Sequence, residues 1–151
     1  MEMVLRGLWG KVPLDLCSLR FTVIYGPGRE TTFTVEELVR AALAGKSLRI
    51  QPMTDWPYVY IGHAARAAVQ ACSSKSRKQL SYFIAHPEKV TPDDIAAAAA
   101  AAGNPVRLEI DGSMPTTARG PLEIEPAARD FGFRAQVGHR EGVRRLIESA
   151  R

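Results

Sequence analysis

Cysteine, histidine and long apolar runs are all scarce in this sequence. Its two cysteines, Cys17 and Cys72, lie far apart along the chain, which excludes a Cys₄ zinc site and argues against a framework of disulfides. None of the histidines, His63, His86 and His139, has a second histidine three or four positions away, so a metal site would have to be assembled from distant segments. We therefore expect no metal and no cofactor.

Hydrophobic segments of membrane-spanning length are also absent. No run approaches the ~18 apolar residues that such a helix needs, and the N-terminal stretch mixes charges with short apolar pieces instead of forming a signal-peptide centre. With 151 residues, 46% of them hydrophobic and 24% charged, the chain has the composition of a globular protein and the length of one domain, residues 1–151. We expect a cytoplasmic protein that does not bind membranes.

Apolar periodicity and turn residues predict a mixture of strands and helices. The β-rich runs 19–25 and 30–33 flank the Gly-Pro-Gly stretch at 26–28, which predicts a β-hairpin. Thr34 and Glu37 have the spacing of a capping box for a following helix. Further strands are predicted at 47–51, 54–62, 105–110, 121–126 and 131–137, and helices at 35–44, 63–72, 75–86, 92–102 and 139–150.

The grouping of these elements indicates the fold class. Hairpins and helices do not alternate strictly, which favours a single α+β domain with a mainly antiparallel sheet and about five helices. A winged-helix-like helical core is one alternative, with three helices followed by a hairpin from 105 to 126. A small α/β sandwich is another.

Positive charge is concentrated in two windows of a chain whose net charge is +4. Residues 63–89 hold 5 Lys or Arg against 1 Asp or Glu, and residues 129–151 hold 6 against 3. On the predicted helices 63–72 and 75–86 the polar faces are basic and almost free of acids, which suits the phosphate backbone of a nucleic acid. Arg119, in the loop of the predicted 105–126 hairpin, adds a further cation. The candidate nucleic-acid-binding residues are Arg66, Gln70, Lys75, Arg77, Lys78, Tyr82 and Arg119.

The leading hypothesis is therefore a small basic protein that binds nucleic acid through cationic helix faces. The same charges are also explained if these residues are only the solvated face of helices packed on a core. The first alternative function is a protein-interaction module, such as an inhibitor or adaptor that docks on another protein. A metal-independent nuclease using His139 with Arg140, Glu141 and Arg144 is the second. No catalytic residue is assigned, a non-enzyme is favoured over an enzyme, and a homo-oligomer is a further option for the partner.

Two short stretches contain residue types that occur in ligand sites. Trp56, Tyr58 and Tyr60 alternate along one predicted strand, so their rings would share one face and form either a stacking platform for bases or part of the core. The Gly-Pro-Gly stretch at 26–28 lacks the strand-to-helix context of a dinucleotide-binding fingerprint.

Overall fold

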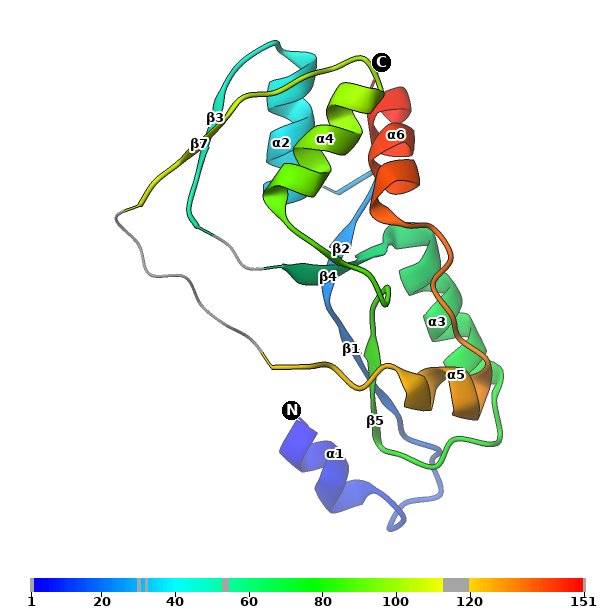
Figure 1. Ribbon diagram of the computed structural model, residues 1–151. Coiled ribbons are helices and arrows are strands. Elements are labelled where there is room, and N and C mark those ends of the chain that lie inside the picture. Colours follow the sequence, from blue (N-terminus) through cyan, green and yellow to red (C-terminus); the bar gives the residue numbers. More distant parts are fainter. Residues whose placement is uncertain (1, 30, 32, 53–54, 113–119, 151) are drawn as a thin grey trace.

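The computed structural model describes residues 2–29, 31, 33–52, 55–112 and 120–150, and these form six helices and seven strands in three small sheets (Figure 1). The α+β class is therefore confirmed, whereas organisation as one domain stays a prediction. The helices are α1 (Glu2–Leu8), α2 (Thr34–Leu43), α3 (Ile61–Ser73), α4 (Pro92–Ala101), α5 (Glu125–Phe131) and α6 (His139–Ser149). The strands are β1 (Ser18–Phe21), β2 (Val23–Tyr25), β3 (Leu48–Ile50), β4 (Trp56–Tyr60), β5 (Ser81–Ile84), β6 (Lys89–Val90) and β7 (Leu108–Ile110).

Parallel pairing dominates the sheets of the described residues. β1 pairs with β5, β2 with β4 and β3 with β7, all parallel, and only β4 with β6 is antiparallel. The expectation of a mainly antiparallel sheet was wrong, because each parallel pair joins strands separated by a long crossover. One crossover, between β2 and β4, contains α2, and another, between β1 and β5, contains α3.

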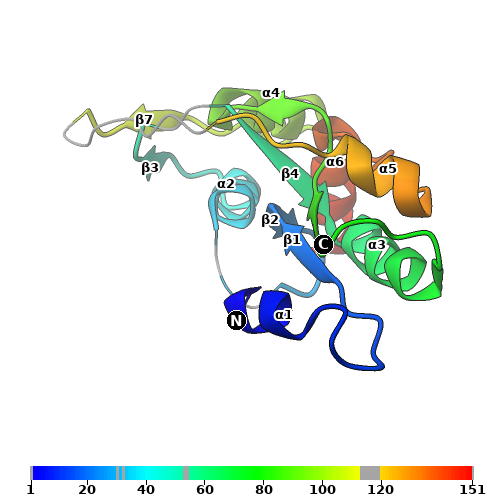
Figure 2. The same cartoon turned by 90° about the horizontal axis from the view of Figure 1, so that it is seen from below.

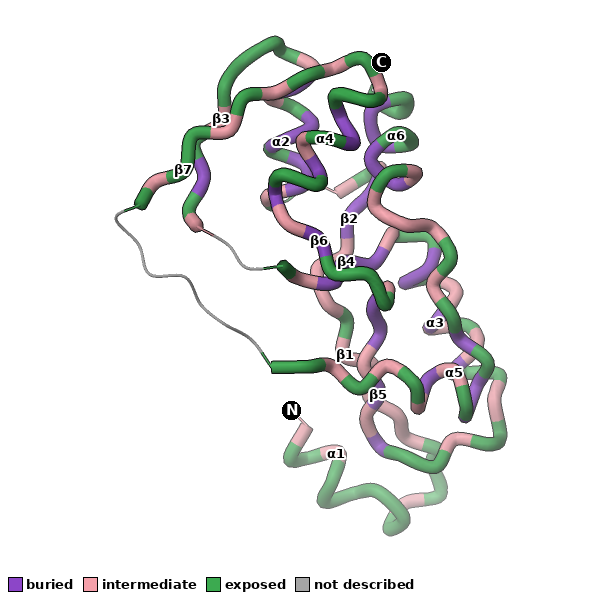
Figure 3. The backbone as a smooth tube through the Cα atoms, viewed as in Figure 1, coloured by how far each residue is buried: buried purple, intermediate pink, exposed green. Residues whose placement is uncertain are grey.

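Two hydrophobic clusters lie on either side of this strand layer. In the first, α2, α4 and α6 pack together over β2 and β4, and Leu38 and Val143 are fully buried. In the second, α5 packs against β5 and α3 against β2 and β4, with Tyr82 and Phe131 in edge-to-face contact at 5.0 Å between ring centroids. Figure 3 shows buried segments in the helices of both clusters, whereas α1 has no buried residue. Figure 2 shows α1 at the margin of the molecule beside β1, away from α4 and α6.

Helices with strong local signals form as predicted. In α4, Thr91 caps the helix in a reciprocal capping box with Asp94, and Pro92 occupies the first turn. The predicted helix 35–44 is present as α2, but its N-cap is Phe33 and has no side-chain cap, so the predicted box of Thr34 and Glu37 does not form. The helices predicted at 63–72 and 139–150 correspond to α3 and α6. No helix in the described ranges is long and apolar enough to cross a membrane.

Four predicted elements are wrong. Residues 75–86 contain the strand β5 instead of a helix, because Leu80, Tyr82 and Ile84 are buried at a spacing of two. The hairpin across 26–28 does not form, since β2 pairs with β4. Residues 121–126 lead into α5, and 131–137 follow it without forming a strand. The winged-helix alternative fails with these elements, because its second helix is missing and β7 pairs with β3.

Candidate functional site

A cleft of about 390 Å³ lies where β2 ends. The parallel strands β2 and β4 end together, with Tyr25 opposite Tyr60, and the chain leaves this edge through a loop on one side and through α3 on the other. Ligands of open α/β folds bind at such carboxyl ends of parallel strands. The residues that line the cleft are Thr22, Val23, Ile24, Tyr25, Arg29, Phe33 and Ile61.

The path of the loop depends on Gly26. Its φ of 140° is a conformation that L side chains rarely adopt, and a Cβ there would lie 2.6 Å from Cγ2 of Ile61, the first residue of α3. The backbone after β2 can therefore lie directly against the start of α3 only because no side chain intervenes. This close approach brings the following residues, including Arg29, to the edge of the cleft.

Arg29 is the cation of the cleft. Its guanidinium donates hydrogen bonds to the carbonyl of Ile24 and to Oγ1 of Thr31, the second at 3.2 Å, and lies 5.4 Å from the centre of the Phe33 ring. It is also 3.7 Å from a carboxylate oxygen of Glu36, whose pKa is raised by burial. The cleft thus combines a positioned guanidinium, an aromatic ring and an apolar floor, which suits an anionic ligand with a planar or apolar portion.

Arg66 holds the segment after α5 instead of facing an open surface. Its guanidinium donates to the carbonyl of Arg134 at 2.6 Å and to Oε1 of Gln136 at 3.2 Å. His63 on the same helix is buried, and burial lowers its pKa. Its Nε2 accepts a long hydrogen bond of 3.5 Å from the backbone N–H of Gln136. The predicted site residue Gln70 is half-buried on α3.

The basic stretch that follows α3 forms a loop around Asp130. Lys78 donates its backbone N–H to both the Asp130 carboxylate, at 3.3 Å, and the Tyr82 hydroxyl, at 2.9 Å. Tyr82 is buried and donates to the same carboxylate at 2.8 Å, so it belongs to the core and not to a binding face. The Arg77 side chain is only 7% exposed and pairs with Asp15.

The predicted residues therefore do not form one cationic face. Lys75 and Lys78 lie in this loop after α3, whereas the Arg66 guanidinium is bonded to Arg134 and Gln136. Arg119 lies outside the described residues. Of the aromatic series on β4, Tyr58 is buried and packs edge-on against Tyr25 at 6.2 Å, so its ring is part of the core.

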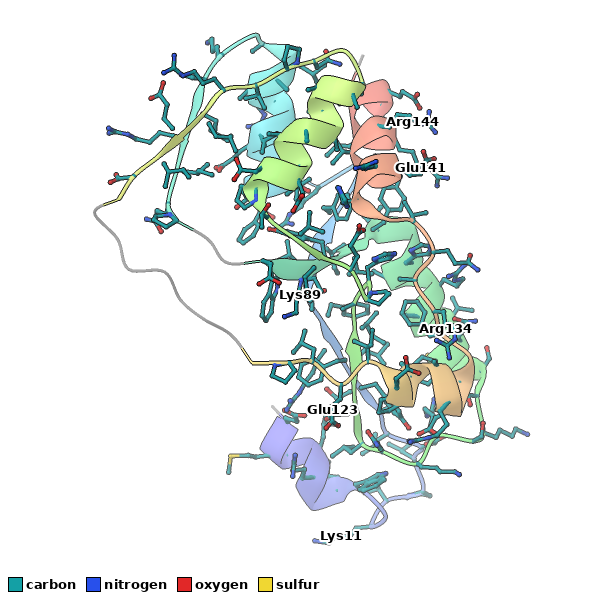
Figure 4. All side chains as sticks on the ribbon, in the orientation of Figure 1. Lys11, Lys89, Glu123, Arg134, Glu141 and Arg144 are labelled. Atoms are coloured by element: carbon teal, nitrogen blue, oxygen red, sulfur yellow. The ribbon has the colours of Figure 1, made fainter. Side chains whose placement is uncertain are left out.

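The charges near His139 are compensated by neighbours. His139 Nδ1 lies 3.0 Å from a carboxylate oxygen of Glu88, and that oxygen lies 3.8 Å from Nδ1 of His86. Burial alone would raise the pKa of Glu88, but the contacts with His139 outweigh it and the pKa is lowered. Figure 4 shows Glu141 and Arg144 on the outer side of α6, where their side chains pair at 2.7 Å. In the described ranges, no group of three or more His, Cys, Asp or Glu side chains could hold a metal ion.

Sequence reasoning missed Arg29, Phe33 and Gly26 as site residues. The only available signal was the Gly-Pro-Gly stretch followed by an arginine, which was interpreted as a hairpin turn. An isolated turn signal does not show which strand the preceding residues pair with, so it could not reveal a parallel strand end.

Solved structures with a similar fold include nucleotide-sugar epimerases. A UDP-glucuronic acid 4-epimerase from Bacillus cereus, in complex with UDP-glucuronic acid and NAD, matches 98% of this chain with a TM-score of 0.82 and 19% identity, over 49% of its own length. A UDP-glucose 4-epimerase from Thermotoga maritima matches 99% with a TM-score of 0.78 and 20% identity, over 50% of its length. The ADP-L-glycero-D-manno-heptose-6-epimerase of Helicobacter pylori matches 97% with a TM-score of 0.78 and 17% identity, over 48% of its length.

Protein-family models give no match, and neither do the curated proteins. The chain spans about half the length of each of these solved structures. The nucleic-acid hypothesis was wrong, because the neighbours in fold are sugar-nucleotide epimerases and the predicted basic helix is a strand and a loop. The comparisons support neither the adaptor nor the nuclease. They show that the chain has the fold of about one half of such an epimerase.

Proposed function

We propose that this chain is the substrate-binding half of an enzyme that acts on a nucleoside-diphosphate sugar. The observation that carries the proposal is the match of nearly the whole chain to half of an epimerase crystallised with UDP-glucuronic acid and NAD. The Thermotoga and Helicobacter neighbours are also named for nucleotide sugars, which supports this class of substrate over other anions.

The cleft at the end of β2 offers suitable chemistry for such a ligand. Arg29 would bind the diphosphate through charge-assisted hydrogen bonds, which are stronger than neutral ones. Phe33, 37% exposed at the cleft edge, would stack against a planar base. The hydroxyl group of Thr22 donates its hydrogen to the carbonyl of Ile84 at 3.3 Å, and its oxygen can still accept a bond from a sugar hydroxyl.

The residues present do not fit NAD, the dinucleotide named with the Bacillus cereus enzyme. A dinucleotide-binding turn needs three glycines in the pattern G-x-G-x-x-G between a strand and the N-terminus of a helix. Here Gly26 and Gly28 follow β2, but Thr31 stands where the third glycine belongs and α2 begins only at Thr34. This pattern occurs nowhere else in the sequence. The proposed ligand of the cleft is therefore the sugar nucleotide and not the dinucleotide.

Isothermal titration calorimetry of the chain with UDP-glucuronic acid tests the proposal. We expect binding, and we expect Arg29→Gln to weaken it by about tenfold or more, since a hydrogen bond to a charged group contributes about 1.5–3 kcal/mol. NAD should give no heat of binding. The matched control is Arg49→Gln on β3, which is remote from the cleft in sequence and does not line it.

Circular dichroism establishes that both variants are folded before they are compared. No binding of UDP-glucuronic acid, UDP-glucose or an ADP-sugar by the folded chain would overturn the proposed function. Equal weakening by Arg29→Gln and Arg49→Gln would remove the cleft from it.

A further inference from the structure

Glu36 is a buried acid beside the cleft at the end of β2. It lies in the first turn of α2, and its side chain is 8% exposed. Neither of its carboxylate oxygens has a hydrogen-bond partner among the described residues. An ionised carboxylate in such a place is costly, and a buried acid avoids this cost by pairing closely with a cation or by taking up a proton.

Arg29 pairs only loosely with Glu36. A guanidinium nitrogen of Arg29 lies 3.7 Å from a carboxylate oxygen of Glu36, which is too long for a hydrogen bond. The guanidinium donates its hydrogen bonds to the carbonyl of Ile24 and to Thr31 instead. Arg29 lines the cleft and can contact a ligand there, whereas Glu36 does not line it and stays buried next to this cation.

Few charged or titratable groups act on Glu36. Burial raises the pKa of Glu36, and this outweighs the opposite effect of Arg29, of the exposed Arg40 one turn along α2 and of the nearby backbone amides of Glu36 and Gly26. Burial also raises the pKa of Tyr25 on β2, and the nearby carboxylate of Glu36 adds to this. Glu36 is therefore close to two residues that line the cleft, Arg29 and Tyr25.

The elements packed against α2 give Glu36 no second cation within the described ranges. These elements are α4, α6 and β3, and their charged or titratable residues are exposed or have partners elsewhere. The residues are Asp93 and Asp94 on α4, Arg49 on β3, and His139, Arg140, Glu141, Arg144, Arg145 and Glu148 on α6. In this part of the chain Arg29 is the one cation that pairs with the Glu36 carboxylate.

A phosphate bound to Arg29 would bring a second anion to the same cation. The guanidinium would then be shared by a phosphate in the cleft and by the buried carboxylate. Like charges this close in a partly buried site disfavour each other's ionised form, and the weaker acid takes up the proton. The diphosphate of a nucleotide sugar is a stronger acid than a carboxyl group, so the proton goes to Glu36.

We propose that Glu36 takes up a proton when Arg29 binds the diphosphate of a nucleotide sugar in the cleft, so that ligand and proton bind together. This inference rests on the proposed function, because it names the residue that makes binding of the same ligand depend on pH. The pKa of Glu36 is higher in the complex than in the free chain. The affinity is therefore highest at low pH and falls as the pH rises through the range between these two values.

Isothermal titration calorimetry with UDP-glucose measures this proton. The diphosphate of UDP-glucose is a diester that does not titrate near neutral pH, so a change in protonation must come from the chain. Titrations at one pH in buffers with different heats of ionisation give the number of protons taken up. We expect net uptake, and we expect the Kd to rise by about tenfold between about pH 5 and about pH 8.

A matched pair of variants assigns the proton to one residue. Glu36→Gln and Glu37→Gln are the same substitution at adjacent positions of α2, the first buried and the second exposed. Glu36→Gln should abolish the uptake and bind UDP-glucose about tenfold more tightly than the unsubstituted chain at about pH 8, since no charge repels the phosphate. Glu37→Gln should keep both the uptake and the pH dependence. Proton uptake that persists in folded Glu36→Gln would overturn the inference.

Carbon-13 NMR of the carboxyl groups covers the case in which Glu36→Gln does not fold. In the unsubstituted chain the Glu36 carboxyl should titrate at a higher pH with UDP-glucose than without it, whereas the Glu37 carboxyl should titrate at the same pH in both. A Glu36 titration that UDP-glucose does not move would overturn the inference as well.

Sulfate keeps the two proposals apart, because it is an anion for Arg29 without a nucleotide or a sugar. Sulfate binding with proton uptake, but no binding of UDP-glucose, rejects only the proposed function. Binding of UDP-glucose without proton uptake rejects only the role of Glu36. If the folded chain binds neither, both are rejected.

Discussion

The two hydrophobic clusters are closed to different degrees. In the first, α2, α4 and α6 contact one another and cover β2 and β4, and Leu38, Ala99 and Val143 are 0% exposed. In the second, α3 and α5 supply four alanines and Phe131, Phe133 follows α5, and β1 of the neighbouring sheet ends at the half-exposed Phe21. The first cluster is covered by three helices in mutual contact, whereas the second lies beside a strand edge that is half exposed.

This difference separates a region that is stabilised by burial from one that leaves apolar side chains exposed. Burial of large aliphatic side chains is the main favourable contribution to folding, and it is concentrated in the first cluster. The helix α1 has no buried residue, and Met3, Val4 and the β1 residue Phe21 are exposed. Substitutions in the two regions should therefore differ in their effect on the free energy of unfolding of the chain alone.

The largest difference is expected for one leucine in each region. Leu38→Ala in α2 leaves a cavity in the first cluster and should lower the free energy of unfolding by about 2–5 kcal/mol. Leu8→Ala in α1 removes a side chain that is 41% exposed and should cost less than about 1 kcal/mol. Urea unfolding followed by circular dichroism measures both. Similar costs for the two variants would mean that α1 is as tightly packed as α2, which would break the contrast.

A smaller contrast is expected for two helical glycines. A Cβ at Gly142 in α6 would lie 2.6 Å from Cζ and 2.8 Å from Cε2 of the buried Tyr25, so Gly142→Ala should destabilise by about 1–3 kcal/mol despite the better helix propensity of alanine. Gly7 in α1 has nothing within 4 Å of such an atom. Gly7→Ala should leave stability unchanged or raise it by up to about 1 kcal/mol.

Thermal unfolding of the two glycine variants gives the test, since the substitution is identical in both. A melting temperature for Gly142→Ala equal to that of the unsubstituted chain would show that α6 does not approach Tyr25 closely. A lower melting temperature for Gly7→Ala would show that α1 is constrained by neighbours.

Helices with their own end signals could be predicted from the sequence. Thr91, Pro92 and Asp94 determine where α4 starts by contacts within one turn, and Gly103 follows its last residues with a φ of 81°. Local signals of this kind act between residues close in sequence, so they are visible without knowledge of the fold. The α+β class followed from the same elements.

Strand pairing could not be predicted in this way. Tyr25 pairs with Tyr60 and Phe21 with Ile84, and nothing within the run 19–25 shows that its two ends join different sheets. The apolar run within 75–86 is short enough to suit a helix or a strand. Its structure depends on distant segments, because β5 pairs with β1 and Lys78 contacts Asp130, 52 positions away.

The candidate site depends on the same long-range pairing. Arg29 and Ile61 line one cleft only because β2 and β4 lie side by side and end at the same edge. The charge pattern of the sequence instead predicted a binding site in the basic residues 63–89. There, Arg66 and Arg77 make contacts with carbonyl groups of the chain, and Arg77 also pairs with an acid.

The smallest predicted effect concerns Asp130, which stabilises the second cluster by a polar contact. The hydrogen bond from Arg129 lowers its pKa to about 2, in spite of burial, and the Tyr82 hydroxyl adds a bond of 2.8 Å. Asp130→Asn keeps an acceptor of similar shape but loses the charge. Because Arg129 is largely exposed and its pairing is screened by solvent, we expect a loss of only about 1 kcal/mol at pH 7.

The pH dependence of the same variant tests this assignment. A carboxyl whose pKa is about 2 in the folded chain and about 3.8 unfolded contributes stability above the unfolded value, and this contribution is lost as the pH falls through the folded value. Asparagine does not titrate, so the difference in stability between the unsubstituted chain and Asp130→Asn should be constant above about pH 5 and shrink toward pH 2. Urea unfolding at several pH values measures it. If this difference in the free energy of unfolding stays constant down to pH 2, the carboxylate is not held by Arg129 and Tyr82. The second cluster is then stabilised near Asp130 by packing and not by this polar contact.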